Sequence, residues 1–177
     1  MSESDKELPV IYLKTGEMHF SEKSVVVLTV LGSCLSVTMF HRKLAIGAVC
    51  HGFLPQCRGR QSCDDSCVEK FKYVDCSIRK MLKLFDRFYA KRCELEVKVF
   101  GGADMFDMAP NGRSTFSVGK LNITSATNIL EQEGLRIISM DVGGKRGRKL
   151  YFNTQTGEVL LKRLQPRVIL AGNGVGI

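Results

Sequence analysis

The chain has 177 residues, 44% of them hydrophobic, and a formal net charge of +8. This length suits one domain with a buried core, and no apolar run approaches the ~20 residues that a membrane-spanning helix needs. The polar, acidic start MSESDKELPVIY argues against a secretion signal. Seven cysteines, an odd number, then favour reduced thiols in a cytoplasm over a disulfide framework.

Hydrophobic patterning predicts many strands with two helices inserted between them. Runs rich in Val, Leu and Thr, or alternating apolar and polar residues, predict strands at 10–13, 24–30, 35–40, 44–51, 95–100, 135–142, 148–152 and 159–164. The clearest helix spans 75–92, where apolar residues recur at helical spacing. A second helix is predicted to begin at an Asn122 cap and to stop at Gly134.

The remaining segments are predicted to be irregular. Residues 53–69 hold a proline, a glycine and three cysteines and predict an extended loop, and 164–177 form a C-terminal tail. No repeat, linker or low-complexity segment divides the chain. We therefore expect a single α+β domain over residues 1–177, with a strand-rich, β-sandwich-like layered core flanked by two main helices.

The most informative motif is LGSC, which ends at Cys34 and is followed by His51 seventeen residues later. Gly32 and Ser33 let the backbone turn just before the thiol, and His51 falls at a strand end. A thiol and an imidazole that meet across strand ends are the minimum apparatus for thiolate catalysis, with His51 as imidazolium beside a partly ionised Cys34. The structural alternative is a small buried cysteine and a histidine satisfied near the core.

The other cysteines and acidic residues favour no second site. The spacing of Cys57, Cys63 and Cys67 lacks the C-x-x-C pairs of common zinc sites, so we interpret the cluster as redox-sensitive or incidental. Cys50 is predicted to face away from His51, and Cys93 to pack behind the first helix. Left out as site residues are the scattered Asp104, Asp107 and Asp141, and His41, which is predicted to lie at the surface.

Basic residues gather late in the chain, at Lys145, Arg146, Arg148, Lys149, Lys162, Arg163 and Arg167. No nucleic-acid-binding module accompanies them. Attraction to an acidic protein surface and a simply solvated face both remain open.

Four blocks carry a family resemblance: TVLGSCLSVTMF, IGAVCHGFLP, VFGGADMF and DVGGKRGRKLYFNTQTGEVLLKR, in this order between about Tyr12 and Arg163. Together they resemble the CheD family of chemoreceptor glutamine deamidases. The resemblance implies an amidohydrolase that converts receptor glutamines to glutamates and releases ammonia. In it Cys34 would form a thioester, His51 would act as acid and base, and backbone N–H groups at the turn of Gly32 and Ser33 would stabilise the oxyanion.

The resemblance also implies a threonine upstream of the cysteine that orients the histidine. Thr29 lies five residues before Cys34, whereas the position six before it is Leu28, which cannot hydrogen-bond. If the family's threonine belongs at six, a one-residue bulge in the strand would let Thr29 serve. Thr38 is a further option.

The implied partners are the cytoplasmic helices of methyl-accepting chemotaxis receptors and a CheC-type phosphatase. The resemblance implies no metal or organic cofactor, no nucleic acid and no membrane insertion, and a cytoplasmic location. The alternative function is a largely non-catalytic docking module that binds receptors or the phosphatase, which Leu28 at the threonine position would favour.

Overall fold

The computed structural model describes residues 8–57, 69–104 and 117–165. These ranges hold nine strands and two α-helices. The strands are β1 (Val10–Tyr12), β2 (Met18–Ser21), β3 (Val26–Leu31), β4 (Leu35–His41), β5 (Ile46–Gly52), β6 (Leu95–Gly101), β7 (Ile137–Val142), β8 (Arg148–Asn153) and β9 (Val159–Arg163). The helices are α1 (Val74–Asp86) and α2 (Val118–Gln132), and short 3-10 turns lie at Lys70–Lys72 and Arg92–Glu94.

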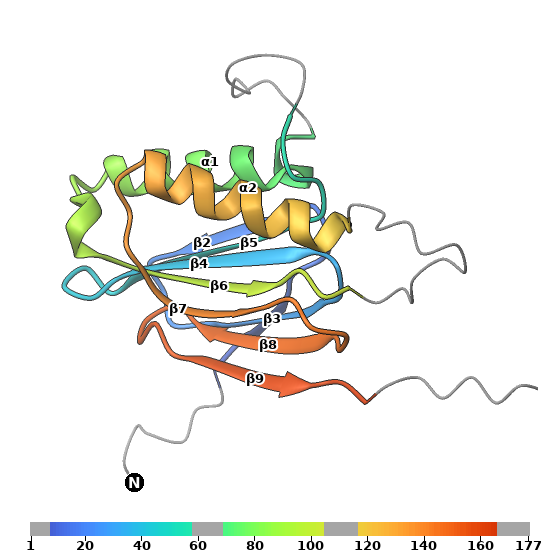
Figure 1. The fold of residues 1–177 in the computed structure, drawn as a ribbon. Coiled ribbons are helices and arrows are strands. Elements are labelled where there is room, and N and C mark those ends of the chain that lie inside the picture. The colour runs from blue at the N-terminus through green and yellow to red at the C-terminus, as the bar shows by residue number, and fades with distance from the viewer. Residues whose placement is uncertain (1–7, 58–68, 105–116, 166–177) are drawn as a thin grey trace, which may run out of the picture.

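The strands form two sheets, one of order β1-β3-β8-β9 and one of order β2-β5-β4-β6-β7. Figure 1 shows three layers, with both helices over the outer face of the five-stranded sheet and the four-stranded sheet against its other face. The strand-rich α+β architecture predicted from the sequence is confirmed. Within the described ranges no helix is long and apolar enough to span a membrane.

The central strand β4 is covered on both faces, and all seven of its residues are buried. Because side chains alternate along a strand, Val37 and Met39 pack into the core beneath the helices. Phe40, from the opposite face, packs with Val27 and Phe152 of the four-stranded sheet. Alternation on β4 thus supplies both cores of the domain.

Two helix boundaries differ from the predictions, and one strand was not predicted. Helix α1 ends at Asp86, and Tyr89 adopts a left-handed φ of 56°, which prevents the helix from continuing to residue 92. Helix α2 begins at Val118, where the Ser117 side chain accepts a hydrogen bond from the Lys120 backbone N–H. Asn122 is therefore not a cap but a buried residue inside the helix. The edge strand β2 was not predicted, although apolar Met18 and Phe20 alternate with polar residues along it.

Two predicted segments are only partly covered by the structure. Of the loop at 53–69, residues 58–68 lie outside the described ranges, and so do 166–177 of the tail.

Candidate active site

Residues 32–34 join β3 of one sheet to β4 of the other, so the LGSC motif is the place where the chain crosses between the layers. Cys34 directly precedes β4, is partly exposed, and packs against the core between the sheets. The predicted strand–turn position of the thiol is confirmed.

His51 lies on β5 directly opposite Ser36 of β4 and is buried, with 3% of its surface exposed. Its neighbour Cys50 points to the helix side, as predicted. Cys34 lies in the bend just before β4 and packs, like Val49 of β5, in the core between the sheets. Cys34 and His51 therefore lie near the same end of the antiparallel β4–β5 pair.

The His51 ring is held by Thr29. The Thr29 hydroxyl donates to the Leu13 carbonyl at 2.8 Å, and its oxygen lies 2.7 Å from Nδ1 of His51. A hydroxyl has one proton, so Thr29 accepts the second hydrogen bond from an N–H at Nδ1. This assigns the neutral ring a bare Nε2, which the Thr15 hydroxyl approaches at 3.4 Å. In the described ranges both side chains that hydrogen-bond to the imidazole are threonines, and Cys34 is not yet among its partners.

The register of β3 decides between Leu28 and Thr29. From Val26 to Leu31 the strand pairs with β8 without a bulge. Thr29 is therefore buried between the sheets, whereas Leu28 lies between Tyr12 and Tyr151 on the alternate face. The predicted bulge is not needed, because a regular strand already directs Thr29 to the histidine. Sequence reasoning missed Thr15, which a loop of the chain brings to the site.

Burial sets the protonation of both groups. Loss of solvent lowers the pKa of His51 to about 4, against smaller opposing effects of the Leu13 carbonyl and the Glu17 charge. Burial raises the pKa of the Cys34 thiol, which its own backbone N–H partly offsets. At neutral pH both groups are uncharged in the free site. This differs from the expected imidazolium beside a partly ionised thiol, since desolvation outweighs the stabilisation available.

Each carbonyl of residues 32–34 accepts a hydrogen bond from a neighbouring element. The Ala103 N–H donates to the Gly32 oxygen at 2.8 Å, and the Gly102 N–H donates to the Cys34 oxygen at 2.7 Å. The Asn122 side chain donates to the Ser33 oxygen at 3.1 Å. In a trans peptide the N–H points opposite to the carbonyl, so the N–H groups of Ser33 and Cys34 are turned away from these donors. The hydrogen bonds to the three carbonyls therefore use neither of these N–H groups.

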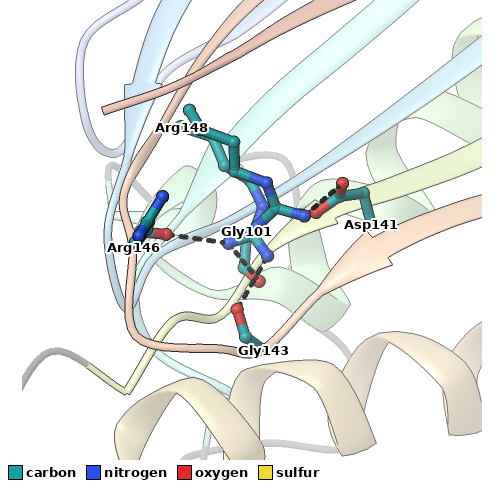
Figure 2. Close-up of polar contacts among 6 residues, drawn as sticks. Gly101, Asp141, Gly143, Arg146 and Arg148 are labelled. Carbon is teal, nitrogen blue, oxygen red and sulfur yellow. Dashed lines mark hydrogen bonds and ion pairs between the residues drawn. The ribbon is translucent and has the colours of Figure 1, made fainter. Parts of the chain in front are cut away.

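A buried arginine supports the glycine segment beside Cys34 (Figure 2). Arg148 donates to Asp141 at 2.6 Å and to the carbonyls of Gly143 and Gly101 at 2.7 and 3.3 Å. A weaker bond reaches the Arg146 carbonyl. Arg148 is 1% exposed, so it does not belong to a basic surface. Arg148 lies two residues before Leu150 and four before Phe152, on the same inward face of β8, and this spacing is the sequence signal that could have identified it.

The residues set aside in the sequence differ in position. His41 is buried rather than at the surface and pairs with Glu94 at 3.3 Å, and Asp141 binds the buried Arg148. Cys93 is exposed and does not pack behind α1. Cys57 is partly buried, whereas Cys63, Cys67 and Asp107 lie outside the described ranges.

Comparison with known proteins identifies the family of the chain. A family model described as CheD chemotactic sensory transduction matches residues 53–163. A protein of Geobacter sulfurreducens named probable chemoreceptor glutamine deamidase CheD 2 is 46% identical over 93% of this chain and 96% of its own length. Proteins named probable chemoreceptor glutamine deamidase CheD from Maridesulfovibrio salexigens and Pyrococcus horikoshii are 36% and 34% identical, over 93% and 76% of the chain and 98% and 79% of their own lengths. The chain belongs to the CheD family.

Proposed function

We propose that this protein is a cysteine-dependent protein-glutamine deamidase that converts glutamines of chemotaxis receptors to glutamates. The observation that carries the proposal is the 2.7 Å contact between Thr29 and Nδ1 of His51, which leaves Nε2 without a proton and able to act as a base. The names of the relatives, probable chemoreceptor glutamine deamidases, support the same substrate class.

The reaction begins from neutral groups. Nε2 of His51 takes the thiol proton as the Cys34 sulfur attacks the carboxamide carbon, which forms a C–S bond and an oxyanion. The N–H groups of Ser33 and Cys34 are the donors we assign to that oxyanion, a contribution of about 3 kcal/mol per donor in comparable sites. His51, now protonated, gives its proton to the departing nitrogen, and ammonia leaves a thioester on Cys34.

Hydrolysis of the thioester completes the cycle. Neutral His51 removes a proton from water as the water oxygen attacks the thioester carbon. The C–S bond breaks, the sulfur regains a proton from His51, and glutamate is released. No redox partner is needed, because every proton and electron pair is accounted for by Cys34, His51 and water.

The partners follow from the substrate class. We assign the reaction to the cytoplasmic helices of methyl-accepting receptors, and therefore to the cytoplasm, with a CheC-type phosphatase as a second partner. Attraction between the net charge of +8 and acidic receptor segments would raise the encounter rate at low salt.

The test is mass spectrometry of a glutamine-bearing receptor fragment after incubation with the protein and with Cys34→Ala. We expect a gain of about 1 Da at defined glutamines that the substitution abolishes, as for a covalent nucleophile. Binding of the fragment without any mass change would instead establish the non-catalytic docking module. Leu28 no longer supports that alternative, because Thr29 supplies the contact to His51.

A further inference from the structure

A single side-chain amide connects the two segments that carry the reacting groups. Asn122 is fully buried on α2. Its Nδ2 donates to the carbonyl of Ser33 at 3.1 Å and to the carbonyl of Phe53 at 3.2 Å. Ser33 directly precedes Cys34, and Phe53 follows His51 by two residues. Each N–H of one amide group therefore holds one of the two segments.

The Asn122 side chain does not give the greatest stability that a residue at this position could give. Its oxygen, Oδ1, is buried and has no hydrogen-bond partner in the described part of the chain. A buried acceptor without a partner is unfavourable, and an apolar side chain of similar size would avoid that cost. The two N–H groups are what an apolar residue could not supply, so the benefit of Asn122 lies in its bonds to Ser33 and Phe53.

We infer that Asn122 is a positioning residue, which sets the distance between Cys34 and His51 by holding both of their segments from one rigid amide. The inference rests on the proposed function for its catalytic meaning. The two protons of a carboxamide lie in one plane at a fixed angle, so the Ser33 and Phe53 carbonyls cannot move apart without losing one bond. The same bond fixes the peptide between Ser33 and Cys34, whose N–H we assign to the oxyanion.

Helix α2 offers a matched control. The Ser125 hydroxyl, one turn further along, donates to the carbonyl of Pro55 at 2.5 Å, and Ser125 is also buried. Ser125→Ala therefore removes a buried bond from the same helix to the same loop, but none to the cysteine turn. Asn128→Ala, at an exposed position of α2, controls for the helix itself.

The first measurement is steady-state deamidation. For Asn122→Ala we expect kcat to fall by ~100-fold, as for a misplacement of about 1 Å between reacting groups, with KM within about twofold. Ser125→Ala and Asn128→Ala should keep kcat within about threefold, on the same principle that they leave the reacting groups in place. An equal loss in Ser125→Ala, or a rise in KM at constant kcat, would overturn the inference.

The second measurement needs no receptor. The rate at which iodoacetamide alkylates Cys34 is followed by peptide mass spectrometry, with exposed Cys93 as internal reference. Because neutral His51 is the base that assists the thiol, we expect Asn122→Ala to slow alkylation in the native background and to have no further effect in His51→Ala. If Asn122→Ala slows alkylation by the same factor in the native protein and in His51→Ala, the inference is contradicted. If the native protein fails to deamidate, the proposed function fails, while this cycle still tests Asn122.

Folding is checked by thermal unfolding of each variant. If Asn122→Ala does not fold, Asn122→Asp serves, since it keeps the shape and has no donor when ionised. We expect the same slow alkylation of Cys34 from Asn122→Asp, and native rates from it would overturn the inference.

Discussion

Thr29 and His51 belong to different sheets, and the 2.7 Å bond between them spans the interface of the two layers. The bond fixes the tautomer of the ring and so selects which nitrogen is free to act as a base. A neutral hydroxyl fills the place that a carboxylate holds in serine protease triads. It adds no negative charge beside the ring, which agrees with the lowered pKa of His51.

Thr29→Val should lower kcat by ~100-fold, within the range that positioned general acid–base groups contribute. Valine has the shape of threonine but lets the His51 ring turn or change tautomer. Thr29→Ser, which keeps the hydroxyl, should recover most of the activity. Leu28→Thr is the control, because its side chain lies on the other face of β3, and a loss there equal to that of Thr29→Val would contradict the assignment. Receptor deamidation kinetics measure all three.

The acid limb of kcat/KM should lie near pH 4. His51 must be neutral to accept the thiol proton, and burial lowers its pKa to about 4. The enzyme should thus retain its activity at pH 5.5, where an ordinary histidine would be largely protonated. A limb near pH 6.5 would show that the His51 ring has an ordinary histidine pKa in the free enzyme and would contradict the prediction. Short assays across pH 4 to 8, with unfolding checked at each pH, make the measurement.

Buried His51 should also make folding sensitive to acid. Its folded pKa of about 4 lies below the ordinary 6.5, so between these values the unfolded chain binds the proton more tightly. The contribution of His51 to the free energy of unfolding is complete above pH 6.5. It falls by about 3 kcal/mol in all as the pH falls to 4. Urea unfolding at pH 7.5, 5.5 and 4.5 should show this loss in the native protein and a smaller one in His51→Gln. If the free energy of unfolding depends on pH equally in the native protein and in His51→Gln, the prediction is contradicted.

Arg148→Met should destabilise the fold by about 3–5 kcal/mol, because it leaves Asp141 and the Gly101 and Gly143 carbonyls without their buried donor. Arg163→Met removes only the exposed partner of Asp141 and should cost about 1 kcal/mol or less. Denaturant unfolding compares the two. Similar costs would mean that the buried bonds of Arg148 add little.

Gly101→Ala should disturb the cysteine turn directly. Gly101 has a φ of +110°, and an added Cβ would lie 2.3 Å from the Cys34 carbonyl oxygen. We expect a loss of about 1–3 kcal/mol in stability for the strained backbone and a fall in kcat. Gly134→Ala, at a φ of +70° with no atom within 4 Å, tests the backbone term alone and should leave kcat unchanged. If kcat falls equally in both, the contact with Cys34 is not the cause.

The residues that the sequence could and could not predict differ in the range of their interactions. The strand-end positions of Cys34 and His51 could be predicted because strand ends and a glycine turn are local signals, whereas their catalytic roles were implied by the family resemblance. The contact of Thr29 depends on the register of β3 against β8, which pairs residues more than a hundred positions apart. Asn122 was wrongly predicted to be a helix cap, because a polar residue at the edge of an apolar run has the same sequence pattern as a cap or as a buried residue inside the helix. Its real partners, Ser33 and Phe53, are 89 and 69 residues away.

Because the chain crosses between the layers at the site, the geometry of the reacting groups depends on the relative position of the two sheets. Thr29 comes from the four-stranded sheet and His51 from the five-stranded sheet, Leu13 directly follows β1, and Cys34 lies in the segment that links the sheets. A slip of one residue along a strand is about 3.3 Å, which exceeds the 2.7 Å length of the Thr29–His51 bond itself. Substitutions that weaken packing around Val49 and Phe152, between the two sheets, should therefore reduce activity before they unfold the domain.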